Sequence, residues 1–246
     1  TDVTLTLRKG RTLGIVGESG SGKSTVARCI VRLIDPTSGD IRLAGNEISH
    51  LSRPLLQPHR KRIQIIFQDP YRSLNPRVTV GETIAEGPIN YGVPHAQALK
   101  RARELLELVD LPPDAVSRYP HQFSGGQRQR IAIARALALD PDVLVADEAV
   151  SALDVSVQAQ VLELLDEIQT RLGIALLFIT HDLRVAAQIC DGVAVMQNGR
   201  IVEQGPAAQV LANPQMPYTK QLLDAAPGRG WDFANFRPIA AANASP

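Results

Sequence analysis

The sequence has 246 residues, with 26 lysines and arginines against 25 aspartates and glutamates, and a formal net charge of +1. This balance lacks the basic footprint that nucleic-acid-binding domains carry, so we expect no nucleic acid among the partners. Hydrophobic residues make up 44% of the chain, which is ordinary for a globular protein, and no apolar run is long enough for a membrane-spanning helix.

Strand and helix signals alternate at the start of the chain. Val3, Leu5 and Leu7 alternate with polar residues, as in a half-buried strand. A second strand is expected at residues 12–16, and helical spacing then runs to about Ile34. Ile41, Leu43 and the pair Gly45-Asn46 are typical of a short strand and a turn.

A polar stretch separates this region from the next strand. Residues 48–62 are broken by Pro54 and Pro58, so we expect no regular element there. The charged run at 59–62 is interpreted as a solvated face. Residues 63–67 read as a strand, and the Pro/Asn-rich loop from Gln68 to Pro76 follows it.

Strand signals stop from Val80 to about Leu139. Residues 98–108 and 125–139 carry apolar side chains at helical spacing instead. The sequence therefore predicts a helical insertion inside an otherwise alternating pattern of strands and helices.

The alternating pattern then returns. We expect buried strands at 143–146 and 174–179, an amphipathic helix from Val157 to Leu172 and a helix at 183–189. Asn198-Gly199 is a hairpin turn signal. Residues 228–246 are interpreted as a partly ordered tail.

The strand at 12–16 and the helix after it flank a complete G-x-x-x-x-G-K-[ST] motif, the strand–loop–helix context of a phosphate-binding loop. Its glycines let successive backbone N–H groups converge on a phosphate, and the helix start adds a positive dipole end. Lys23 is expected to reach the β- and γ-phosphates, and the Ser24 hydroxyl to ligate Mg²⁺. The candidate cofactor-binding residues are Gly17, Glu18, Ser19, Gly20, Ser21, Gly22, Lys23, Ser24 and Thr25.

Two acids, Asp147 and Glu148, follow the apolar strand at 143–146. Asp147 is expected to hold Mg²⁺ through its hydration shell, because Mg²⁺ keeps several waters in proteins. Glu148 lies one residue further into the expected cleft and is placed to polarise a water molecule. On their own, two adjacent acids fit a plain turn equally well, and it is the phosphate-binding loop that favours the functional interpretation.

A second anion site is expected at the start of the helix at 125–139. Ser124 is a good helix N-cap, and Gly125-Gly126 leaves the helix start uncovered before Gln127. A capped helix without a ligand is the alternative.

Together these motifs resemble the ATPase subunit of an ABC transporter over roughly residues 1–215. The matches are Walker A (17–25), the Q-loop glutamine (Gln68), the signature (Ser124–Gln127, with Phe123 in place of the usual Leu), Walker B (143–148), the D-loop (Ser151–Asp154) and the switch histidine (His181). The resemblance implies an α/β P-loop ABC ATPase fold, with an N-terminal antiparallel β portion and an inserted helical subdomain at about 70–140. It divides the chain into an ATPase domain at 1–215 and a C-terminal segment and tail at 216–246.

The resemblance also implies the roles of the site residues. Glu148, His181, Lys23 and Gln68 would be catalytic, and Asp154 would join the nucleotide-binding residues. Ser24, Gln68 and Asp147 would bind Mg²⁺, and ATP would be the nucleotide. Two subunits would act head to tail, with Ser124–Gln127 of one closing over ATP on the other.

A finer resemblance points to the dipeptide and oligopeptide importer branch. It rests on residues 67–76, on 149–156 and on the late segment Pro217–Leu223. The implied partners are a second ABC ATPase subunit, an integral membrane permease and, indirectly, a solute-binding protein. The implied location is peripheral, on the cytoplasmic face of the inner membrane. ATPases for nickel or another small solute, soluble non-transport ABC ATPases and a nucleotide-binding regulator remain alternatives.

Several features depart from the family pattern or bear on the partner surface. Ala149 replaces the proline common after the Walker B glutamate, and no cysteine cluster follows Tyr218.

The aromatic residue that stacks on adenine is expected upstream of Thr1, so we expect the chain to be an excised or truncated piece. Tyr71 and Leu74 are expected to offer apolar area to the permease.

Cys29 and Cys190 are the two cysteines, too few and too far apart for a metal site or a disulfide framework. We expect both to be small core residues of a protein from a reducing compartment.

Overall fold

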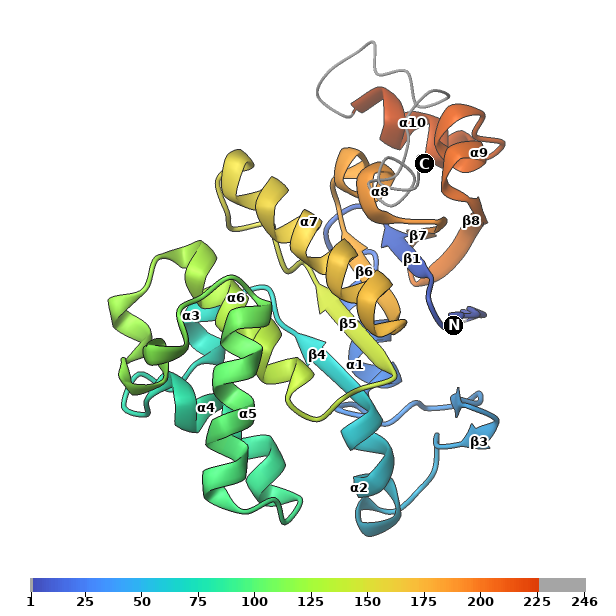
Figure 1. The fold of residues 1–246 in the computed structure, drawn as a ribbon. Helices are drawn as coiled ribbons and strands as arrows, with labels where there is room; N and C mark the ends of the chain where they lie inside the picture. Colours follow the sequence, from blue (N-terminus) through green and yellow to red (C-terminus); the bar gives the residue numbers. More distant parts are fainter. Residues whose placement is uncertain (1, 226–246) are drawn as a thin grey trace.

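Short apolar runs build a six-stranded sheet in the computed structural model, which describes residues 2–225 (Figure 1). The strands are ordered β4-β5-β6-β1-β7-β8. Their bounds are β1 Thr12–Val16, β4 Ile63–Ile66, β5 Val143–Asp147, β6 Ala175–Thr180, β7 Gly192–Gln197 and β8 Arg200–Pro206. A separate antiparallel pair consists of β2 Arg42–Leu43 and β3 Asn46–Glu47.

Every neighbouring pair in the large sheet is parallel except β7 and β8, which form the hairpin predicted at Asn198-Gly199. Asn198 and Gly199 both have positive φ, 48° and 77°, as a tight two-residue turn requires. In the register of the parallel strands, Val16 lies beside Thr180, and Asp147 beside Ile179. The chain segments that leave these strands therefore emerge at one edge of the sheet.

Alternate side chains of the strands supply two separate cores, one on each face of the sheet. Val16, Ala146 and Phe178 belong to a large core, which they share with side chains of the helical region 80–137 and of the later helices. Their chain neighbours Ile15, Val145 and Ile179 belong to a small core with the helix α1 (Lys23–Ile30). Strands buried on both faces explain the continuous apolar runs in the sequence.

The helices cover both faces of the sheet (Figure 1). Residues 70–137 contain helices and no strand, as the loss of strand signals predicts, and the division of the chain into an ATPase domain with a helical subdomain stays a proposal. The bounds are α1 Lys23–Ile30, α2 Arg53–Arg62, α3 Pro70–Ser73, α4 Val80–Asn90, α5 His95–Leu108, α6 Gly125–Leu137, α7 Val155–Leu172, α8 Leu183–Ile189, α9 Ala207–Ala212 and α10 Pro217–Ala225, with 3-10 turns at Pro113–Ser117 and Pro120–Gln122.

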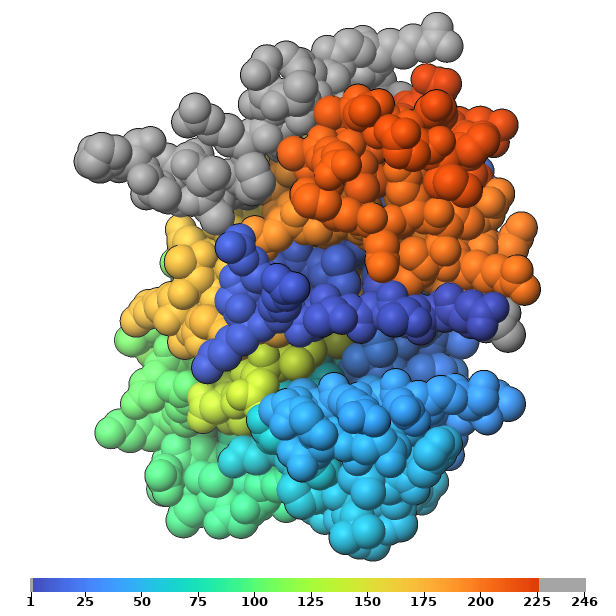
Figure 2. Space-filling view, turned by 90° about the vertical axis from the view of Figure 1, so that its right-hand side faces the viewer, coloured from blue at the N-terminus to red at the C-terminus, as the bar shows by residue number. Residues whose placement is uncertain are grey.

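The strand expected at residues 3–7 is absent. Residues 2–7 have no strand partner within the described chain, although Val3, Leu5 and Leu7 are half-buried against the small core while their neighbours are exposed. Figure 2 shows this dark-blue start of the chain as a band across one face of the molecule. The alternation predicted the buried face correctly, but alternation carries no information about a hydrogen-bonding partner. The N-terminal antiparallel β portion consists of β2 and β3 in the described residues.

Two helix bounds also differ from expectation. Helix α1 ends at Ile30 and not near Ile34, because Arg32 has a φ of 55°, outside the right-handed helical region. Helix α2 forms where the prolines predicted an irregular stretch. Pro54 lies in the first turn, where its missing N–H costs nothing, and Pro58 comes only one turn later.

The end of the described chain adds α9 and α10, which local sequence patterns did not predict. The predicted tail at 228–246 lies outside the described residues. No helix within 2–225 is long and apolar enough to cross a membrane.

The large core should tolerate little loss of volume at β6. Phe178 is fully buried, so Phe178→Ala is expected to lower the free energy of unfolding by about 3–5 kcal/mol. Leu55→Ala is the control, because Leu55 is 62% exposed and its removal should cost about 0.5 kcal/mol or less. Urea unfolding of both variants measures the difference, and equal losses would contradict the core assignment.

Candidate active site

The carboxyl ends of β1, β4, β5 and β6 meet at one edge of the sheet, which is where ligands bind in open α/β folds. The loop 17–22 leaves β1, and Gln68 lies two residues beyond β4. Glu148 follows β5 directly, and His181 follows β6 directly. The structure therefore brings the four predicted catalytic residues to the same edge.

The loop between β1 and α1 depends on glycine. Gly17, Gly20 and Gly22 have φ values of 153°, 81° and 104°, which other residues rarely adopt. A Cβ at Gly17 would lie 2.2 Å from the backbone oxygen of Met196 in β7. The start of the loop can therefore pass β7 only because residue 17 has no side chain.

The Lys23 side chain lies inside this loop. Its ammonium donates hydrogen bonds of 2.8 Å to the backbone oxygens of Gly17 and Glu18. Burial lowers the pKa of Lys23, and the nearby carboxylates of Glu148 and Asp147 act against that shift. A buried cation beside two acids is suited to a polyanionic ligand.

Ser24 and Asp147 are joined directly, since the Ser24 hydroxyl donates to Asp147 Oδ1 over 2.8 Å. Burial raises the pKa of Asp147, and Glu148 adds to the rise, while the Ser24 hydrogen bond opposes it. The hydroxyl predicted to ligate Mg²⁺ and the carboxylate predicted to hold it through water thus lie in contact at the sheet edge.

Glu148 is the centre of a second set of contacts. Gln68 Nε2 donates to Glu148 Oε2 over 2.9 Å and lies 3.3 Å from Ser151 Oγ. His181 Nδ1 lies 3.6 Å from Glu148 Oε1. The backbone of Glu148 has a φ of 51°, and its N–H donates to Ile179 O. The side chains of Gln68 and His181 therefore meet at the Glu148 carboxylate.

Two further features of the loop suit a phosphate. The Ser21 hydroxyl is buried and has no hydrogen-bond partner among the described residues. The first turn of α1 has Gly22 as its N-cap and no side chain capping its N–H groups. Unpartnered donors at a helix start are a ready site for an anion.

The predicted signature residues Ser124, Gly125, Gly126 and Gln127 lie elsewhere in the chain's fold. Ser124 caps α6 by accepting from the Gln127 N–H, and Gln127 Oε1 accepts in turn from the Ser124 N–H. Across residues 2–225 no hydrogen bond joins this segment to residues 17–25. Asp154 begins α7 as an exposed N-cap without a side-chain cap bond.

The loop after Gln68 corrects one expectation. Leu74 does not offer apolar area to a partner, because it is 3% exposed within the large core. Asp69 caps the single turn α3 by accepting from the N–H groups of Tyr71 and Arg72, and this turn directs Leu74 inward. Tyr71 remains 61% exposed, with the Arg128 guanidinium 3.9 Å from its ring centre.

Three residues make contacts at the site that were not predicted from the sequence. Ser151 accepts from Gln68, and its own hydroxyl donates to Glu148 O. Gly199 in the β7–β8 turn donates its N–H to Ser21 O. Tyr218 in α10 accepts from the Glu18 N–H. The last two residues lie far along the chain from the loop, so no local pattern could have found them.

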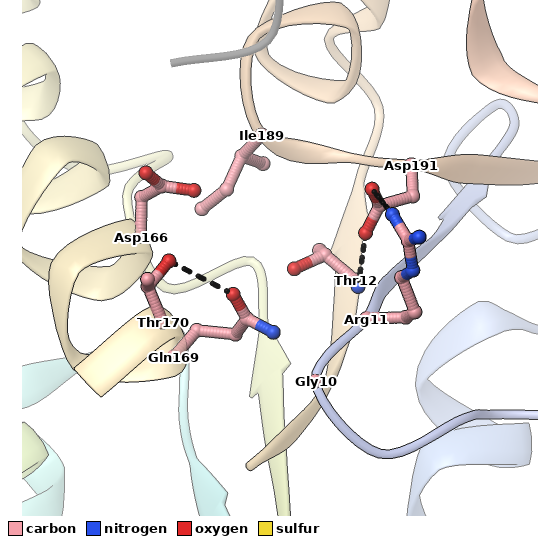
Figure 3. Close-up of a pocket in the computed structure, with 8 residues that line it drawn as sticks. All are labelled: Gly10, Arg11, Thr12, Asp166, Gln169, Thr170, Ile189 and Asp191. Atoms are coloured by element: carbon pink, nitrogen blue, oxygen red, sulfur yellow. Dashed lines mark hydrogen bonds and ion pairs between the residues drawn. The ribbon is translucent and has the colours of Figure 1, made fainter. Parts of the chain in front are cut away.

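A pocket of about 200 Å³ lies away from these residues, at the amino ends of β1 and β7 (Figure 3). Asp191 accepts from the Thr12 N–H and pairs with Arg11 there, and Asp166 lines the opposite wall. It contains none of the predicted site residues.

Comparison with known proteins agrees with the geometry. A family model described as "ABC transporter" matches residues 1–151. A peptide import ATP-binding protein of Brucella ovis is 52% identical over 239 residues, which cover 97% of this chain and 75% of that protein. The chain belongs to the ABC transporter family. It is accordingly an ATP-binding protein and an ATP-hydrolysing transport ATPase.

Two solved ABC proteins share its fold. CbiO1 from Clostridium perfringens, part of an ABC transporter complex, has a TM-score of 0.78 and 32% identity, covering 86% of this chain and 83% of its own. The ATP-binding cassette MJ0796, solved as a dimer with ADP and Pi, has a TM-score of 0.74 and 30% identity, covering 82% and 88%. The predicted P-loop ABC ATPase fold is confirmed.

The contact between Gly17 and Met196 O gives a test of the loop geometry. Gly17→Ala should lower the affinity for ATP by at least about tenfold, because either the loop or β7 has to move. Gly10→Ala is the matched control near the other end of β1. Gly10 also has a positive φ, 67°, but a Cβ added there would meet nothing within 4 Å among the described residues.

We expect Gly10→Ala to cost roughly 1–2 kcal/mol of stability and to leave ATP affinity unchanged. Equilibrium ATP titration of both variants decides the matter. Equal affinities in the two variants would show that the close approach at Gly17 does not control the site.

Proposed function

We propose that this chain binds ATP at residues 17–25, hydrolyses it at Glu148, and so powers the import of peptides. The observation that carries the proposal is the convergence of Lys23, Glu148, Gln68 and His181 at one sheet edge. The peptide class is supported by the name of the Brucella ovis relative, a peptide import ATP-binding protein.

In this proposal the loop 17–25 binds the phosphates. The N–H groups at the start of α1, the unpartnered Ser21 hydroxyl and the Lys23 ammonium supply the donors and the charge. Catalysis is then mainly positioning and charge stabilisation, as in other phosphoryl transfers.

Glu148 is proposed to orient the attacking water and accept its proton. The water oxygen bonds to the γ-phosphorus, the bond from that phosphorus to the bridging oxygen breaks, and ADP and phosphate leave. Gln68 donates to one Glu148 carboxylate oxygen, and His181 lies beside the other. Both residues therefore orient the Glu148 carboxylate. His181 is also proposed to contact the γ-phosphate.

Ser24, Asp147 and Gln68 are proposed to hold Mg²⁺, which would neutralise charge on the phosphates. The Ser24 and Asp147 oxygens fit this role, since they already lie 2.8 Å apart, and Gln68 bonds to the neighbouring Glu148. Within residues 2–225 no group of three or more His, Cys, Asp or Glu could hold a metal. That is compatible with Mg²⁺, which is usually bound by one or two carboxylates together with phosphate oxygens and water.

The signature Ser124–Gln127 and Asp154 are proposed to act on ATP held by a second ABC ATPase subunit, in a head-to-tail pair. Among the described residues, no hydrogen bond joins Ser124–Gln127 to the loop 17–25 of the same chain, which supports this role. The dimeric structure of MJ0796 supports it as well. Ser124–Gln127 of each subunit would complete the site of the other.

The loop 68–76 is proposed to contact an integral membrane permease, and a solute-binding protein would act through that permease. CbiO1 is part of a transporter complex, which supports such an assembly. The chain would then lie peripherally on the cytoplasmic face of the inner membrane. Residues 1–215 would be the ATPase domain, with the helical subdomain at about 70–140.

Replacing the proposed base should separate binding from hydrolysis. Glu148→Gln keeps the size of the side chain but cannot accept the proton, so ATP turnover should fall by about 10²–10⁴ while ATP affinity is retained. Glu163→Gln, on the exposed face of α7, is the control and should keep the wild-type rate. Loss of affinity with an unchanged rate per bound nucleotide would refute the role of Glu148.

The same variant addresses the substrate. Cells in which the Glu148→Gln variant replaces the wild-type protein should lose uptake of a labelled di- or oligopeptide and keep uptake of nickel. Nickel uptake that falls while peptide uptake persists would favour the small-solute alternative.

The exposed ring of Tyr71 gives a test of the partner surface. Tyr71→Asp should lower peptide uptake in cells, because the proposed permease contact is lost. ATP hydrolysis by the isolated chain should be unchanged, because the Tyr71 ring stacks on Arg128 and not on Lys23 or Glu148. Leu55→Asp is the control, because it changes an equally exposed apolar side chain in α2, at the amino end of β4 and not at the carboxyl end where the loop begins. Normal uptake with Tyr71→Asp would contradict the assignment.

A further inference from the structure

The late segment Pro217–Leu223 is a distinctive part of the sequence that the ATPase mechanism does not use. In the structure it lies in α10, which packs on the large core through Leu222 and Leu223. The Tyr218 ring is 9% exposed in the same core. The hydroxyl at the end of this buried ring points to the phosphate-binding loop.

Tyr218 Oη accepts a hydrogen bond of 3.2 Å from the Glu18 N–H. The oxygen of the same residue, Glu18 O, accepts from the Lys23 ammonium over 2.8 Å. Glu18 is thus held on both sides, by a tyrosine from α10 and by the lysine of the loop. A shift of this residue would move one of the two oxygens that position the Lys23 ammonium.

The start of α10 is held to the sheet. The Glu203 carboxylate in β8 accepts from the N–H groups of Gln215 and Met216, over 2.8 and 3.2 Å. β8 pairs with β7, whose Met196 O faces Gly17, and the turn between them donates from Gly199 to Ser21 O. The β7–β8 hairpin and α10 therefore hold the loop at Gly17, Glu18 and Ser21.

We propose that Tyr218 is a positioning residue for ATP binding, through which α10 holds the start of the phosphate-binding loop in its binding conformation. A loop that is already ordered loses less conformational entropy when the ligand binds. Without the hydroxyl, the loop would spend part of its time in other conformations. The apparent affinity for ATP then falls in proportion to the fraction of molecules whose loop has the binding conformation.

The test compares Tyr218→Phe with the wild-type chain by equilibrium titration with ATP. The variant keeps the buried ring and removes only the hydroxyl. We expect ATP affinity to fall by about two- to tenfold, the range that corresponds to one net hydrogen bond. The KM for ATP should rise by a similar factor, while kcat at saturating ATP changes less than about twofold, because Tyr218 contacts neither Glu148 nor His181.

Tyr91→Phe is the matched control, since the Tyr91 hydroxyl also bonds to a backbone group, donating to Gln57 O over 2.8 Å. It should leave ATP affinity at the wild-type value. A purely structural role of Tyr218 would lower the melting temperature without this split between KM and kcat. Glu203→Ala provides a second variant, because it frees the start of α10 while Tyr218 remains, and should weaken ATP binding in the same direction.

The proposal rests on ATP binding at residues 17–25, and the wild-type titration tests that separately. A wild type that does not bind ATP would overturn both this inference and the proposed site. A wild type that binds, together with Tyr218→Phe of equal or higher affinity, would overturn the role of Tyr218 alone. A fall in kcat at unchanged affinity would overturn it as well.

Discussion

The tightest constraint at the site is the approach of the loop after β1 to the backbone of β7. A Cβ at residue 17 would lie 2.2 Å from Met196 O, so this crossing is possible only with glycine. Because the loop lies so near β7, the turn after β7 can reach Ser21, and Lys23 can fold back to the oxygens of Gly17 and Glu18. The missing side chain thus fixes the start of the loop whose oxygens the Lys23 ammonium contacts.

The same sheet edge gives two adjacent acids different environments. Asp147 is the last residue of β5, buried and bonded to Ser24, and its pKa is raised mainly by burial. Glu148 turns away from the strand through a φ of 51° and is bonded to Gln68. A regular strand would have placed the two side chains on opposite faces of the sheet. The unusual backbone conformation lets both side chains lie at one edge, which is the arrangement that the proposed metal-binding and base roles require.

Much of this site could be predicted because its parts are local in sequence. The phosphate-binding loop, the acids after β5 and His181 after β6 are each positioned by the end of their own strand, and parallel strands align those ends. Tyr218 and Gly199 could not be predicted, because their contacts with the loop depend on how the last part of the described chain folds back. Leu74 was misplaced for a different reason, since Asp69 turns α3 inward through a local cap that a Pro/Asn-rich composition does not reveal. The alternation at residues 3–7 predicted burial but not strand pairing, which depends on a second segment.

The signature segment shows why a glycine pair is an ambiguous sign of a ligand. A Cβ at Gly126 would lie 2.4 Å from Val157 Cγ1, so packing of α6 against α7 already disfavours a larger residue there. A Cβ at Gly125 would meet only Leu153 Cδ2 at 3.8 Å among the described residues, an ordinary contact. Packing within this chain therefore accounts for Gly126 and leaves Gly125 unexplained. Close approach of a phosphate from a partner subunit is the kind of constraint that would explain Gly125, and it is also what the head-to-tail arrangement proposes.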